Sequence, residues 1–99
     1  MSNFNAAHAA YIKTLDAVAV CKALGIDSRE AAMYAKEATT EAHLAIMEYH
    51  DGRIVDAMHI TARAQAMAGE FCRASGLGGM DHHISTIMDC LLADITAAH

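Results

Sequence analysis

Four glutamates recur along one alanine-rich stretch of the sequence, residues 29–52, with two histidines between and beside them. The glutamates are Glu30, Glu37, Glu41 and Glu48, and the histidines are His43 and His50. Carboxylates and imidazoles that project from one side of a helix can hold metal ions. The stretch is therefore either half of a metal site or the solvated side of an ordinary helix, and ligand spacing distinguishes the two.

The spacing argues against a di-metal site in a helical core. Di-iron four-helix proteins supply a Glu-x-x-His pair from each of two helices, because a separation of three residues places both ligands on one face. This chain has no Glu-x-x-His, and its nearest equivalent is Asp56-x-x-His59. Asp56 and His59 fall on the polar side of their expected helix. The sequence thus predicts no metal centre and no cofactor.

A mononuclear zinc or copper site is the alternative. Asp81, His82, His83 and Cys90 lie on or just before the last expected helix, and these residue types bind such ions. His83 and Cys90 are two helical turns apart, or about 10 Å, which is too far for one ion without other ligands. A metal-binding bundle or metal-dependent enzyme would draw on His43, His50, His59, His82 or His83.

Other catalytic chemistry has little support in the sequence. Cys21, Cys72 and Cys90 each border an apolar face, and a free cysteine is usually a small buried hydrophobe. No G-x-S-x-G or H-E-x-x-H signature occurs. The glycine-rich segment 76–79 lacks the lysine and serine that follow the glycines of a phosphate loop. We therefore expect a protein that is not an enzyme.

The charge balance narrows the class of partner. Seven basic and twelve acidic residues give the 99-residue chain a formal net charge of −5, which disfavours direct binding to nucleic acid or to an anionic membrane. The three cysteines form no C-x-x-C pair, the N-terminus lacks a signal-peptide pattern, and no apolar run could span a bilayer. These features predict a cytoplasmic protein with reduced thiols.

The chain divides into four expected helices that form a single domain, residues 1–99. Proline is absent, and the frequent alanine, methionine, leucine and glutamate are good helix formers. The expected helices span residues 3–24, 28–50, 53–74 and 81–97. Short turns at Gly25 and at Asp51-Gly52 join antiparallel neighbours, so the sequence predicts an all-α, compact antiparallel bundle of four helices.

Capping residues mark where the expected helices begin. Ser2 or Asn3 suits the start of the first helix, and Asp81 suits the start of the fourth. Asp27, followed three residues later by Glu30, forms a variant of the capping box and predicts the start of the second helix.

Two helix faces are candidates for contacts beyond the bundle's own core. Segment 28–50 carries an alanine-rich face, and small residues let two helix backbones approach closely. Segment 3–24 is apolar over a wide arc around Tyr11, Leu15 and Val18, which indicates contacts on two sides. Only 5% of the residues are aromatic, so bulky core side chains are scarce and self-association would add burial. We expect a homodimer through one of these faces.

The sequence therefore predicts a small acidic helical protein that acts by protein–protein contact. It would serve as an inhibitor, of the kind that a phage or mobile element encodes, or as an adaptor or regulator of a larger protein machine. The expected partner-binding residues, which would dock onto a basic surface, are Glu30, Glu37, Glu41, Glu48, Asp56 and Arg63. A bundle whose histidines respond to pH between about 5 and 7 is a third hypothesis.

Overall fold

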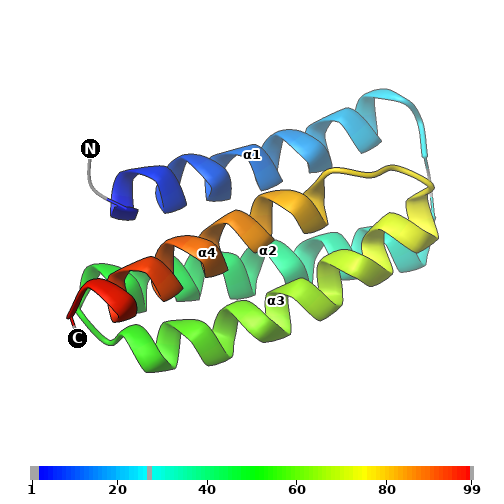
Figure 1. The fold of residues 1–99 in the computed structure, drawn as a ribbon. Helices are drawn as coiled ribbons and strands as arrows, with labels where there is room; N and C mark the ends of the chain where they lie inside the picture. Colours follow the sequence, from blue (N-terminus) through cyan, green and yellow to red (C-terminus); the bar gives the residue numbers. More distant parts are fainter. Residues whose placement is uncertain (1–2, 27, 99) are drawn as a thin grey trace.

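The computed structural model describes residues 3–26 and 28–98, and these residues form a four-helix bundle. The helices are α1 (Asn3–Ala23), α2 (Arg29–His50), α3 (Ile54–Ser75) and α4 (Met80–Ala98). Each begins and ends within one residue of its expected range, so the all-α prediction is confirmed. Successive helices run in opposite directions (Figure 1), and α1 and α3 each pack against both α2 and α4.

Glycines and a serine set the helix ends near the first two turns. Gly25 and Gly52 have φ angles of 71° and 85°, a left-handed conformation that suits a residue without a side chain. The hydroxyl of Ser28 caps α2 by accepting a hydrogen bond of 3.3 Å from the backbone N–H of Ala31. The expected caps Ser2 and Asp27 lie outside the described residues.

The expected cap at Asp81 is wrong, because the helix begins before this residue. Helix α4 begins at Met80, and the carboxylate of Asp81 lies inside the first turn, where it accepts a hydrogen bond of 2.9 Å from the N–H of His82. The side chain of Met80 is completely buried. Starting the helix one residue earlier places this large apolar side chain in the core, which outweighs the preference of aspartate for a capping position.

The core combines a close α2–α3 contact with larger side chains from α3 and α4. The alanine-rich face of α2 is buried in the bundle core, and it consists of Ala31, Ala35, Ala38, Ala42 and Ala45. Its lack of bulk lets α3 approach closely, and α2 and α3 make the most extensive contact of any helix pair. The large, fully buried apolar side chains of α3 and α4 are Phe71, Met80, Ile84, Ile87 and Leu91.

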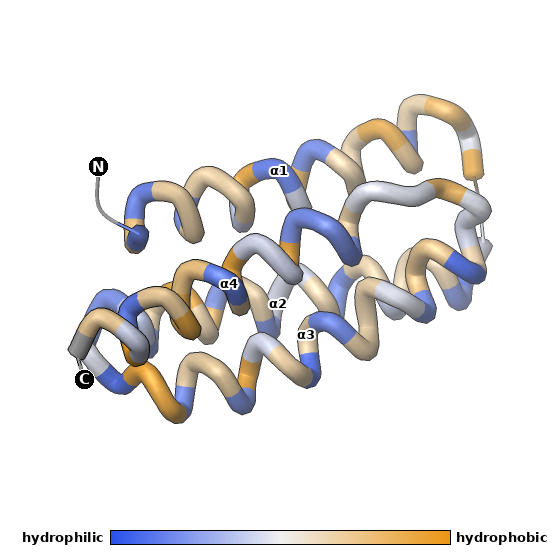
Figure 2. Tube along the Cα trace, viewed as in Figure 1, coloured by the Kyte–Doolittle hydropathy of each residue, from blue (hydrophilic) through white to orange (hydrophobic). Residues whose placement is uncertain are grey.

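Apolar and polar residues are interspersed along every helix (Figure 2), as expected for helices with one buried side. Within the described residues, no helix is both long enough and apolar enough to cross a membrane.

Candidate functional site

A groove between α2 and α3 contains three of the residues expected to bind a partner. Glu37 and Glu41 are one helical turn apart on α2, and Arg63 faces them from α3. The Nη2 and Nε atoms of Arg63 lie 3.1 and 3.2 Å from the same carboxylate oxygen of Glu41. This α2–α3 groove has a volume of about 590 Å³, within the range of about 300–1,000 Å³ that is usual for binding pockets.

The walls of the α2–α3 groove are apolar and its rim is charged. Met33 of α2 and Ala66 and Met67 of α3 supply the apolar surface. Met33 is 47% exposed. Lys36 and Thr40 complete the lining, so the rim carries charges of both signs.

A second pocket continues from the groove toward the turn between α2 and α3. This hairpin pocket has a volume of about 380 Å³ and is lined by Glu48, Arg53, Asp56, His59, Ile60 and Arg63. Arg63 lines both hollows, which makes them one continuous strip along the α2–α3 face. The strip follows from the helical repeat, because the charged residues lie beside the buried alanine face and not on it.

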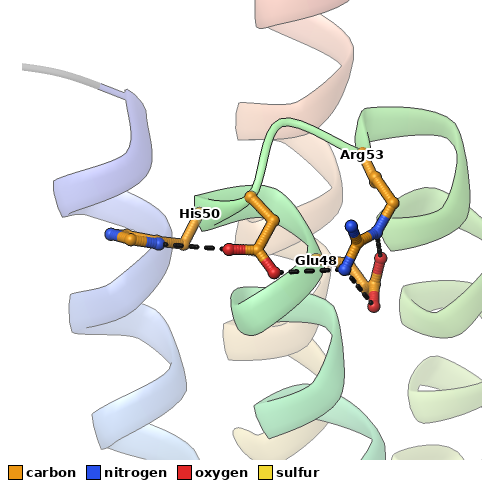
Figure 3. Close-up of polar contacts among 4 residues, drawn as sticks. Glu48, His50 and Arg53 are labelled. Atoms are coloured by element: carbon orange, nitrogen blue, oxygen red, sulfur yellow. Dashed lines mark hydrogen bonds and ion pairs between the residues drawn. The ribbon is translucent and has the colours of Figure 1, made fainter.

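Arg53 organises the charges at the end of the hairpin (Figure 3). It forms an ion pair with Glu48, and its Nη2 atom lies 3.1 Å from Asp51 Oδ2. The hydrogen bond from Arg53 lowers the pKa of Glu48, and the same contact raises the pKa of Arg53. The imidazole Nδ1 of His50 lies 3.6 Å from Asp51 Oδ1 on the other side. The contact with Arg53 therefore favours the charged form of Glu48.

Five of the six residues expected to bind a partner line this strip. Glu30 does not: it is exposed in the first turn of α2, outside both pockets. The row of glutamates along α2 is also less acidic than the sequence indicates, because Glu41 and Glu48 are each neutralised by an arginine of the same chain. Within the described part of the chain, Glu30 and Glu37 form no ion pair.

The apolar part of the groove was missed by the sequence analysis. Neither Met33 nor Met67 was among the expected site residues, because their positions on facing sides of α2 and α3 depend on the register between the helices. The available signal is the small, exposed residue Ala66 beside Met67 on α3, which leaves room next to the longer side chains of α2.

The histidines proposed as metal ligands are spread over the surface. His43 lies beside Tyr11 of α1, with ring centroids 5.6 Å apart, and His50 lies beside Phe4 at the same separation. His59 lines the hairpin pocket, and His82 and His83 neighbour each other at the start of α4. Across residues 3–26 and 28–98, no three His, Cys, Asp or Glu side chains cluster closely enough to hold a metal ion.

The cysteines are free and two of them are poorly ionised. Cys21 and Cys90 are buried, and Cys72 is half-buried with its Sγ 3.7 Å from Asp81 Oδ1. Burial raises the pKa of the Cys72 and Cys90 thiols. Because the thiolate is the nucleophilic form, this environment does not activate either sulfur.

The geometry of the α2–α3 strip suits the insertion of an apolar side chain flanked by charged groups. It presents no arrangement of nucleophile, base and orienting group among the described residues that line it. No protein-family model matches the chain, and no curated protein or solved structure shows significant similarity to it.

Proposed function

We propose that this protein acts by protein–protein contact, as an inhibitor or adaptor of a larger protein machine, and that the α2–α3 groove is its contact surface. The observation that carries the proposal is the apolar wall of the groove, formed by Met33, Ala66 and Met67, within a rim of opposite charges. Protein interfaces share this pattern, in which an apolar centre is surrounded by polar residues.

The groove suits a partner that inserts an apolar anchor and carries a basic residue beside it. Methionine side chains adapt their shape to an incoming group, and anchors seated in pockets dominate binding energy. Glu37 on the rim is free of an intramolecular ion pair within the described chain, so it is available to a lysine or arginine of the partner. Contact with a basic protein surface also agrees with the net charge of −5. The proposal places the protein in the cytoplasm, where unpaired cysteines remain reduced.

Capture from extracts of the source cell tests the groove directly. We expect one dominant partner to be retained by the native protein, lost by Ala66→Trp, and retained by Ala93→Trp. Both alanines are exposed, so each tryptophan adds the same bulk, but only the first fills the groove. A partner that binds both variants equally would rule out the groove as the contact surface.

The proposal includes a homodimer through the outer face of α1. Four large apolar side chains are exposed along α1 and its C-terminal end: Ile12, Leu15, Val20 and Leu24. The alanine-rich face of α2 is buried within the same chain, so α1 is the remaining candidate of the two expected faces. Light scattering should give a dimer mass that falls to that of a monomer in the Ile12→Glu/Leu15→Glu variant. A monomeric native protein would contradict this part of the proposal.

A further inference from the structure

A separate hollow lies between α1 and α2. Its volume is about 400 Å³, and it reaches down to the core, because Phe71 of α3 and Ala35 of α2 line it and are only 1% and 3% exposed. Val18 of α1 and Ile26, in the link after α1, add apolar walls. This α1–α2 hollow therefore has the buried apolar interior of a small-molecule site.

The hollow follows from how α1 packs. Helix α2 makes far less contact with α1 than with α3. The α2 residues that face the hollow include Ala31, Ala32 and Ala35, whose short side chains leave the space open. The hollow is lined by the C-terminal half of α1 and the N-terminal half of α2. These two helix halves lie at the same end of the bundle (Figure 1).

The charged residues that line the hollow are both cationic. They are Lys22 of α1 and Lys36 of α2, and both are exposed. The chain has three lysines in all, so two of the three line this one hollow of an acidic protein. Among the described residues, neither lysine forms an ion pair. The long side chain of a lysine can follow an apolar wall while its ammonium group stays at the entrance.

We propose that the α1–α2 hollow binds the free anion of a medium-chain aliphatic carboxylic acid. The alkyl tail enters the apolar interior over Phe71, where it is removed from water. The carboxylate stays at the entrance between Lys22 and Lys36, which donate charge-assisted hydrogen bonds to it. The site goes beyond the proposed protein contact, since it lies between a different pair of helices and shares only Lys36 with the α2–α3 groove.

The test is a titration of the full-length protein with decanoate, kept below the concentration at which it forms micelles. Backbone amide shifts are followed by NMR, and decanol serves as the uncharged ligand of equal tail length. We expect saturable one-to-one binding with the largest shifts at Val18, Ile26 and Ala35. Decanol should bind about fivefold to tenfold more weakly, because it cannot pair with two exposed ammonium groups.

Three variants separate the hollow from the rest of the surface. Lys22→Gln/Lys36→Gln should abolish the preference for decanoate over decanol while leaving decanol binding unchanged. Ala32→Trp, at an exposed position that lines the hollow, should abolish binding of both ligands. Ala66→Trp, which blocks only the α2–α3 groove, should bind decanoate like the native protein. These outcomes do not depend on whether a protein partner occupies the groove.

Three results would overturn the inference. The first is a titration in which decanoate causes no saturable shifts, or causes shifts only on the exposed apolar face of α1 around Ile12 and Leu15. Equal affinity for decanoate and decanol in the native protein would remove the role of the lysines. The third is a protein that sediments with phosphatidylglycerol vesicles but does not respond to decanoate. The ligand would then be a membrane surface and not a free acid.

Discussion

The phenol of Tyr49 on α2 donates a hydrogen bond to the carboxylate of Asp94 on α4, although these two helices lie diagonally across the bundle. The other oxygen of Asp94 accepts a hydrogen bond of 2.6 Å from the side-chain amide of Asn3 on α1. One carboxylate therefore connects three helices. Both donors lower the pKa of Asp94, and burial followed by the hydrogen bond raises the pKa of Tyr49.

Removing the phenol of Tyr49 should destabilise the bundle. We expect Tyr49→Phe to lower the free energy of unfolding by about 1–2 kcal/mol at pH 7, because a hydrogen bond to a charged acceptor is lost from a buried residue. Urea unfolding followed by circular dichroism measures the difference. Tyr34→Phe is the matched control, since the hydroxyl of Tyr34 has no hydrogen-bond partner in the described chain, and it should change stability little. Equal effects of the two variants would contradict the assigned role.

The contribution of Tyr49 should also depend on pH. The pKa of Asp94 is lower in the folded than in the unfolded chain, so its hydrogen bonds stabilise the fold at pH values above the ordinary aspartate value of about 4. This stabilisation is lost as the pH falls through the lowered folded pKa. The stability difference between the native protein and Tyr49→Phe should therefore shrink below about pH 4. A constant difference down to pH 2 would show that Asp94 is not the partner that matters.

The alanine-rich face of α2 should tolerate no added bulk. Ala42 is 1% exposed in the closely packed core, and we expect Ala42→Leu to cost about 1–3 kcal/mol of stability through overpacking. The melting temperature is measured by thermal unfolding. The control is Ala93→Leu, which adds the same atoms at an exposed position of α4. If the two variants melt at the same temperature, α2 and α3 are not packed as closely as the structure has them.

The helices were predictable because their signals are local. A left-handed glycine such as Gly52 and the 3.6-residue repeat of apolar residues depend on neighbours within a few positions. On α4, Ile84, Ile87 and Leu91 recur at this spacing, and all three are buried. The start of α4 was misplaced because burial of Met80 is a tertiary effect, which no capping rule contains.

The site was only partly predictable, because its geometry depends on the register between helices. The sequence indicated which carboxylates share a side of α2, but not that Arg63 and Arg53 would neutralise Glu41 and Glu48. An ion pair separated by 22 residues, as Glu41 and Arg63 are, has no sequence signature. The hollows beside α2 are likewise spaces left by small side chains, and they appear only once neighbouring helices are in place.

Charge reversal at the two glutamates of α2 that form no ion pair in the described chain should weaken partner binding. We expect Glu30→Lys/Glu37→Lys to weaken capture of a protein partner about tenfold, mainly through slower association, with a smaller effect at high salt. The matched control is Asp16→Lys/Asp89→Lys, which makes the same charge change at exposed acids of α1 and α4. Surface plasmon resonance against the captured partner measures both. Equal weakening by the two variants would point to net charge alone, and no weakening would exclude this surface.

Acid pH should destabilise the bundle through His83. Burial, followed by the nearby charge of Lys13, lowers the pKa of His83 in the folded chain. The unfolded chain therefore takes up a proton first, so stability is highest above the ordinary histidine value of about 6.5 and falls as the pH drops below it. We expect His83→Gln to reduce the loss of stability between about pH 7 and pH 5. The comparison variant is His59→Gln, which removes an exposed histidine of α3. Urea unfolding at several pH values measures the free energy of unfolding of each variant. If its pH dependence is the same in the native protein and in His83→Gln, the pH response belongs to other groups.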